Sequence, residues 1–280
     1  MKSNEQELKA RLARLADLPG EAIDPGEGAL LIAGLEHPTV DMEPYWKLLA
    51  EIRANASLGK DAPSVEERQA LLNGVLIGRF GFKGDSDTYE DPDNADMIRV
   101  IDRRMGLPIS LGILYLHVAR ANEWAAHGLA FPRHFLVRLE DDAGRRLILD
   151  PFYDGRMVGP ADLRGLLKEL VGEGAELTPN NYTDVDNREV LLRLCGNVQL
   201  RRMQAGDHAG TLRVIETALL FAPNVPALWR EAGLANLRLG NAAQAVVTFE
   251  RFLSFPVDPD EEAKVKVILK KLYEKPFSGH

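Results

Sequence analysis

The chain has 280 residues, of which 45% are hydrophobic and 27% charged, as expected for a globular protein of one large or two ordinary domains. Its formal net charge of -8 argues against a nucleic-acid partner, because phosphate binding needs clustered lysine and arginine. The amino terminus is charged, and no apolar run approaches the length of about 18 residues that spans a bilayer. We therefore expect neither a signal peptide nor a membrane anchor.

Residues 1–85 are predicted to form a helical subdomain. Apolar residues recur at three- and four-residue spacing, which predicts helices at 8–16, 26–36, 42–56 and 64–80. Ser64 and Glu67 have the spacing of a capping box at the start of the fourth helix. The residues that follow, 81–94, are rich in Gly, Asp and Pro and predict a long surface loop.

Residues 86–186 are predicted to form an α+β core that makes one unit with the first 85 residues. Helices are expected at 95–105 and 108–122, where Gly106 suits the end of the first and Pro108 the first turn of the second. Short β-type segments at 127–131, 134–139 and 145–150 predict a small antiparallel sheet.

Residues 187–280 contain an internal repeat with a period of 34 residues. Gly206 aligns with Gly240, and Asp207 with Asn241. Together with the position of Trp229, this pattern resembles the tetratricopeptide (TPR) repeat. The helix at 260–275 would cap the stack. We expect such repeats to bind a protein or peptide partner.

The only cysteine, Cys195, aligns with Trp229 and is therefore expected to lie inside the repeat as a small hydrophobic residue. One cysteine excludes a disulfide framework and is consistent with the reducing cytoplasm of a bacterium. Neither a metal site nor a cofactor is expected, because no His or Cys pair has metal-ligand spacing.

His134 and Asp150 flank a predicted hairpin. If its turn is the three-residue loop 142–144, then Asp141 pairs with Arg145, and His134 and Asp150 become diagonal neighbours on one face. A loop of two or four residues would place them on opposite faces. An oriented His–Asp pair is the base half of a catalytic triad. The alternative is a capping aspartate beside a half-buried histidine.

Three motifs carry a family resemblance: RRMGLPISL (103–111), FPRHFLVRL (131–139) and LDPFYDGRMV (149–158). With DPDN before them and TPR-like helices after them, they resemble the SirB-type transglutaminase-like and TPR proteins of bacteria, over nearly the whole chain. The resemblance implies a papain-like, transglutaminase-like core in which His134 and Asp150 match the family's histidine and aspartate. The family usually has glycine where this chain has Arg133.

The resemblance also implies where a nucleophile would stand in an active relative, at the helix start 108–110. No cysteine is present there, and Ser110 is the one candidate, with a first-turn cap or solvent-facing filler as its simpler role. We therefore expect a non-catalytic interaction or regulatory scaffold, a pseudoenzyme. The alternative is a hydrolase or acyltransferase that uses His134 and Asp150 with Ser110 or an activated water.

Overall fold

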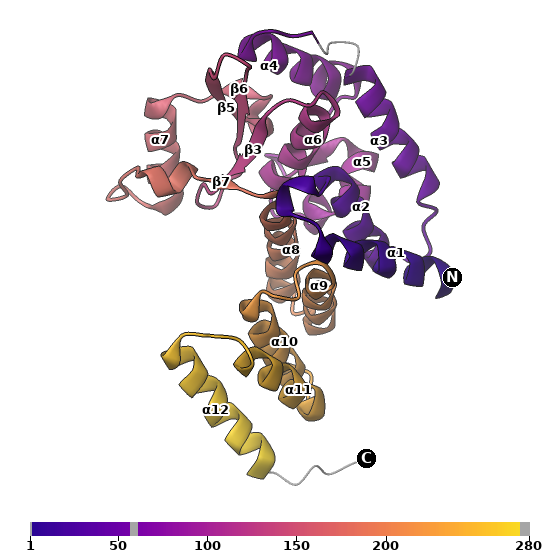
Figure 1. The fold of residues 1–280 in the computed structure, drawn as a ribbon, viewed down its shortest axis with the longest axis vertical. Helices are drawn as coiled ribbons and strands as arrows, with labels where there is room; N and C mark the ends of the chain where they lie inside the picture. Colours follow the sequence, from indigo (N-terminus) through magenta and orange to yellow (C-terminus); the bar gives the residue numbers. More distant parts are fainter. Residues whose placement is uncertain (1, 57–60, 275–280) are drawn as a thin grey trace. The chain divides into compact units, whose positions relative to one another are not determined.

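The computed structural model describes residues 2–56 and 61–274. They fall into two compact units (Figure 1), one made of the residues up to Arg11 with Leu18–Leu194, and one made of Leu12–Asp17 with the residues from Cys195 on. Within those described ranges, no helix is long and apolar enough to cross a membrane.

The first unit combines helices with a small sheet, as the α+β prediction requires. Its α-helices are α1 (Lys2–Arg14, whose last turn passes into the second unit), α2 (Pro25–Glu36), α3 (Glu43–Ala56), α4 (Val65–Asn73), α5 (Met97–Arg103), α6 (Pro108–Ala121) and α7 (Pro160–Val171). Short helical turns of this unit are η2 (Gly20–Ala22), η5 (Pro92–Ala95), η6 (Pro151–Tyr153) and η7 (Pro179–Tyr182), whereas η1 (Leu15–Asp17) belongs to the second unit.

Helix α6 is the central element of the first unit. All of its residues from Pro108 to Ala119 are buried, which is the pattern of a helix that is apolar all round. Pro108 occupies its first turn, where a missing N–H costs nothing. It contacts α2, α3 and strand β3, so that it lies between the other helices and the sheet (Figure 1).

The sheet has five strands in the order β6-β5-β4-β3-β7, all antiparallel. Their bounds are β3 (Ala126–Leu129), β4 (Val137–Glu140), β5 (Arg146–Asp150), β6 (Arg156–Met157) and β7 (Asp184–Val185). A separate parallel pair joins β1 (Lys83–Gly84) to β2 (Met105–Gly106). Helix α7 covers the sheet through Leu163 and Leu167, which pack against Phe131 and Leu136.

The hairpin between β4 and β5 has the predicted register. The backbone N–H of Asp141 donates to the carbonyl of Arg145 at 3.0 Å, and Gly144 adopts a left-handed φ of 78°. Val137 pairs with Leu149 at the far end of the ladder. The three-residue turn is confirmed, although β4 begins three residues later than predicted and leaves His134 in the loop before it.

Residues 64–94 also differ from the sequence-based expectation. The capping box at Ser64 is present, but α4 ends at Asn73 and continues as a π-helical turn, η4 (Gly74–Arg79). Residues 81–94 are not a simple surface loop, because Asp85 and Asn94 are only 4% and 0% exposed. Asp85 is buried because it accepts hydrogen bonds from Thr88 and Arg103.

The second unit is a stack of helices, and the predicted repeat is visible in its backbone. The helices are α8 (Asn187–Gln204, which begins in the first unit), α9 (His208–Phe221), α10 (Pro226–Arg238), α11 (Ala242–Leu253) and α12 (Pro259–Glu274). Gly206 and Gly240, 34 residues apart, both adopt left-handed φ angles, 73° and 77°. The N–H groups of Asp207 and Asn241 each donate at 2.9 Å to the residue five positions earlier.

Candidate functional site

His134 and Asp150 are brought together. The His134 Nε2 lies 2.9 Å from Asp150 Oδ1, and the two side chains are 6% and 0% exposed. Both residues lie just beyond the last ladder pair of β4 and β5, so the hairpin register places them at the same end of the sheet. The pair has the contact that an aspartate uses to orient a histidine base.

Asp150 also builds the local backbone. Its Oδ1 accepts the N–H of Phe152 at 3.2 Å and so caps the helical turn η6. Its Oδ2 has no hydrogen-bond partner in the described part of the chain, and the Arg156 guanidinium lies 3.8 Å away. One carboxylate therefore holds both the imidazole and the turn that carries the aromatic rings next to it.

Aromatic rings surround the imidazole. Phe152 meets the His134 ring edge-on at 6.2 Å between centroids, and Tyr153 stacks over it at 6.3 Å. Tyr153 is 47% exposed, and the Arg156 guanidinium lies 4.7 Å above its ring. Tyr153 and Arg156 thus cover the imidazole on its solvent side.

Arg193 holds the loop that carries His134. This α8 residue donates to the backbone carbonyls of Leu129, Phe131 and His134. Its guanidinium also lies 5.5 Å from the Phe135 ring centroid. Burial lowers the pKa of Arg193, although a guanidinium remains charged at neutral pH. No sequence pattern indicates this role, because Arg193 lies 59 residues from His134 along the chain.

Ser110 is committed to the interior. Its side chain is 0% exposed, and its Oγ donates to the carbonyl of Asn94 at 2.8 Å. The expectation of a first-turn cap or a solvent-facing filler was wrong, because Ser110 instead fastens residues 92–95 to the start of α6. A hydroxyl in that bond has its proton directed at a carbonyl rather than at a base.

The structure also shows the positions of Cys195 and Arg133, two further residues considered in the sequence analysis. Cys195 is 3% exposed in α8, as predicted for a residue inside the repeat. Arg133 has a left-handed φ of 58°, a conformation that costs little for glycine and more for other residues. The backbone conformation explains why glycine suits this position. The Arg133 side chain turns away to donate to the Leu170 carbonyl at 3.1 Å.

Two further histidine–aspartate pairs occur in the first unit. His117 Nδ1 lies 2.7 Å from Asp24 Oδ1, and His37 Nε2 lies 2.6 Å from Asp96 Oδ2. Asp24 caps α2 and Asp96 caps α5, just as Asp150 caps η6. In this fold the pairing of a histidine with a helix-capping aspartate is a recurring structural device, so the pair at His134 does not by itself indicate catalysis.

The electrostatics of these pairs follow from their surroundings. Burial would raise the pKa of Asp24, but hydrogen bonds from His117 and the Glu27 N–H, with nearby Arg53, lower it below its usual value. Near Asp150, burial raises the pKa of the Tyr115 hydroxyl, and the charges of Asp154 and Asp150 add to the effect. Tyr115 therefore stays protonated and donates to Asn73 Oδ1 at 2.8 Å.

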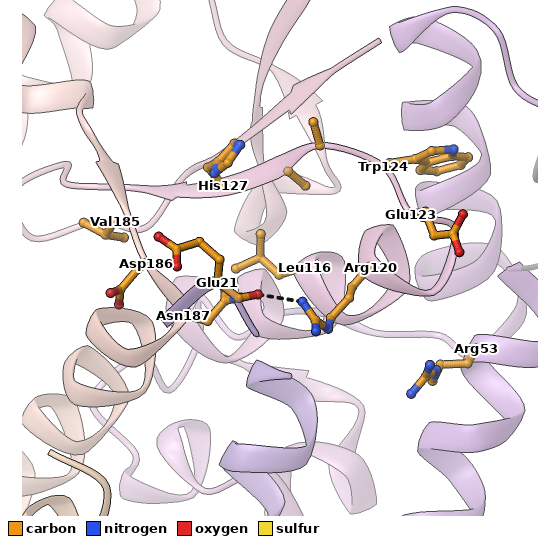
Figure 2. A pocket seen from close by; sticks show the side chains of 12 residues that line it. Glu21, Arg53, Leu116, Arg120, Glu123, Trp124, His127, Val185, Asp186 and Asn187 are labelled. Atoms are coloured by element: carbon orange, nitrogen blue, oxygen red, sulfur yellow. Dashed lines mark hydrogen bonds between the residues drawn. The ribbon is translucent and has the colours of Figure 1, made fainter. Parts of the chain in front are cut away.

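A cavity of about 610 Å³ lies elsewhere in the first unit, at the carboxyl end of α6, and neither His134 nor Asp150 lines it. Figure 2 shows this cavity with Arg120, Glu21 and His127 around it. Across residues 2–56 and 61–274, no three His, Cys, Asp or Glu side chains form a group that could hold a metal ion.

Comparisons with known proteins agree with this architecture. The family model described as the transglutaminase-like superfamily matches residues 46–196, and a tetratricopeptide-repeat model matches residues 199–268. A UPF0162 protein of Xylella fastidiosa (strain Temecula1) is 31% identical over 253 residues, which cover 89% of this chain and 90% of that protein.

Other relatives are more distant. Protein SirB1 of Salmonella typhimurium is 27% identical over 200 residues, which cover 71% of this chain and 74% of SirB1. Among solved structures, menin matches with a TM-score of 0.44 and 9% identity, over 98% of this chain and 79% of the menin chain. A likeness at that level carries no argument about function.

Proposed function

This chain belongs to the transglutaminase-like superfamily, in the group that contains SirB1 and the UPF0162 proteins, and on that premise we propose that it is a non-catalytic protein-interaction or regulatory scaffold. Its transglutaminase-like core would serve as architecture, and its TPR repeats would hold a protein or peptide partner. The bacterial relatives and the single cysteine support a bacterial cytoplasmic location.

The burial and hydrogen bonding of Ser110 are the main support for a non-catalytic role. A triad needs a nucleophile whose proton the histidine can take. The window 108–110 holds no cysteine, and the Ser110 hydroxyl is buried and bonded to Asn94. The His134–Asp150 pair then has a structural role, in which a helix-capping aspartate holds a histidine side chain, as in the His117–Asp24 and His37–Asp96 pairs.

The repeats offer a surface for a partner. Between α10 and α12 lies a hollow of about 360 Å³, lined by Leu237, Ile268, Leu272, Lys271 and Glu274. Its aliphatic side chains are half-buried and flanked by charged ones. This is the mixture that a short amphipathic segment of a partner requires.

Partner capture with the full-length chain tests the proposal. Lys271→Glu reverses one charge at the hollow, and Lys266→Glu reverses a charge on the same helix at a residue that does not line it. We expect proteins that co-purify with the unmodified chain to be depleted at least ~10-fold by Lys271→Glu and retained by Lys266→Glu. If both variants retain the co-purifying proteins equally, the hollow between α10 and α12 is not the partner-binding surface.

A further inference from the structure

The cavity at the carboxyl end of α6 has the size and construction of a small-molecule site (Figure 2). Its volume of about 610 Å³ is typical of ligand pockets. Its lining comes from η2, α3, the end of α6 and the turn after it, β3, and the junction of β7 with α8, all within the first unit. A hollow assembled from so many segments is held open by the fold rather than by one loop.

One part of the lining is apolar. Leu116 and Trp124 are 3% and 7% exposed, and Ala126, on β3, also lines the cavity. These side chains are fixed by packing and give a ligand a surface on which to bury a hydrocarbon group. The charged residues of the lining are Glu21, Arg53, Arg120, Glu123 and Asp186.

A fixed guanidinium supplies positive charge. The Arg120 nitrogens donate to the backbone carbonyls of Glu21 and Ala22 at 2.7 and 2.9 Å, which hold the side chain in place. In the described part of the chain, no carboxylate lies within 4.0 Å of Arg120 to neutralise it. Arg53, at the other side of the cavity in Figure 2, lies 3.7 Å from both the Asp24 and Glu27 carboxylates and is therefore already engaged with carboxylates of the protein.

Two of the three lining carboxylates lie on the opposite side of the view from Arg53, whereas Glu123 lies on the same side as Arg53. Glu21 and Asp186 are both at the left of Figure 2, with His127 above them. Asp186 is held by the Glu189 N–H, which donates to its Oδ1 at 2.9 Å. Among residues 2–56 and 61–274, neither the Glu21 carboxylate nor the His127 ring has a hydrogen-bond or ion-pair partner.

From this arrangement we propose that the cavity binds a small zwitterion, an amino acid or a short peptide with a free ammonium group, a free carboxylate and an apolar side chain. The carboxylate would meet Arg120, and the ammonium group would meet Glu21 and Asp186. The apolar side chain would pack on Leu116 and Trp124. An ion pair that a cavity shields from bulk water gains more than one in open solvent.

Calorimetric titration of the full-length chain with defined probes tests the ligand class. Leucine and leucyl-leucine present both charged ends, and comparing them separates an amino acid from a peptide as the preferred source. N-acetyl-leucine lacks the ammonium group, and leucinamide lacks the carboxylate. We expect at least one zwitterion to bind, and each blocked compound to bind at least ~10-fold more weakly than the tighter-binding zwitterion. No binding by either zwitterion, or equal binding by the blocked compounds, overturns the proposal.

A matched pair of variants tests the location. Glu21→Gln removes the carboxylate but keeps the backbone carbonyl that Arg120 needs, and its exposed side chain leaves the core intact. Glu7→Gln makes the same change at an exposed residue that does not line the cavity. We expect affinity for the best zwitterion to fall ~10-fold in Glu21→Gln and to be unchanged in Glu7→Gln. Unchanged affinity in Glu21→Gln overturns the proposal, whatever the result of partner capture.

Discussion

Gly112 shows how one residue determines the packing beside His134. A Cβ at this position would lie 2.3 Å from Cδ1 of Phe135, the neighbour of His134. The missing side chain lets the Phe135 ring lie directly against α6. Gly128 on β3 leaves space for the same ring, because a Cβ at this position would lie 2.6 Å from its far end. The aromatic ring is thus held between a helix and a strand.

Gly112→Ala is therefore expected to destabilise the protein by ~1–3 kcal/mol through overpacking, although alanine is the better helix former. Gly165→Ala is the control, since Gly165 lies in α7 with nothing within 4 Å of the added Cβ. That change should stabilise by about 0.5–1 kcal/mol. Urea unfolding measures the change in unfolding free energy in both variants. A change of the same sign in both would show that the close approach to Phe135 does not determine the effect of Gly112→Ala.

The His37–Asp96 pair predicts a pH dependence. The hydrogen bond from Asp96 raises the pKa of the His37 ring above its usual value, despite the opposing effect of burial. A raised pKa in the folded state means that the pair stabilises below the ordinary histidine pKa and loses that contribution as pH rises through the folded value. The unfolding free energies of the unmodified chain and of His37→Gln should therefore converge as the pH rises from 5.5 to above neutrality. A constant gap across that range would refute this.

The sequence predicted some residue contacts at the candidate site and missed others. The turn at Gly144 and the approach of His134 to Asp150 could be predicted, because a hairpin is local and its loop sets the register. The bond from Ser110 to Asn94 could not be, because it depends on how residues 81–94 fold back into the core.

At the scale of elements, α8 positions the site loop through Arg193. Its three backbone acceptors belong to residues 129–134, which connect β3 to β4. A planar guanidinium can serve several carbonyls at once, and a lysine ammonium group cannot reproduce that geometry. Helix α8 is therefore part of the support for His134 as well as the first helix of the repeat.

Arg193→Lys is expected to cost ~1–3 kcal/mol and to speed hydrogen exchange in residues 129–136. Arg164→Lys, an exposed residue of α7, is the control and should change neither. Exchange measured by mass spectrometry distinguishes them. If residues 129–136 keep their protection in Arg193→Lys, this helix does not hold the loop.

The repeat helices suggest a stabilising change. Asp207 caps α9 by accepting the Gly210 N–H at 2.7 Å, but Asn241, its counterpart 34 residues later, makes no side-chain cap on α11. Asn241→Asp should therefore stabilise by about 0.5–1 kcal/mol through the cap and the helix dipole, and Asp207→Asn should destabilise. Thermal unfolding at neutral pH measures both, and a loss of stability in Asn241→Asp would count against the correspondence of the repeats.

At the scale of the whole molecule, the order of elements was readable from the sequence because it depends on periodicity. Apolar spacing indicated most helices, and the 34-residue period indicated the repeats. Tertiary packing overrode local signals at residues 81–94, where composition suggested a surface loop but buried Asp85 is paired with Arg103. The hydrogen bond from Thr88, with Asn94 and Arg103 nearby, lowers the pKa of Asp85 to about 2 against the effect of burial.

We propose that the start of α6 carries no working nucleophile. Incubating the full-length chain with a serine-reactive fluorophosphonate, followed by intact-mass and peptide analysis, tests this proposal. We predict no adduct at Ser110, because its hydroxyl is buried and donates to Asn94. A stoichiometric adduct at Ser110 that His134→Gln abolishes would contradict the account and restore a hydrolase or acyltransferase.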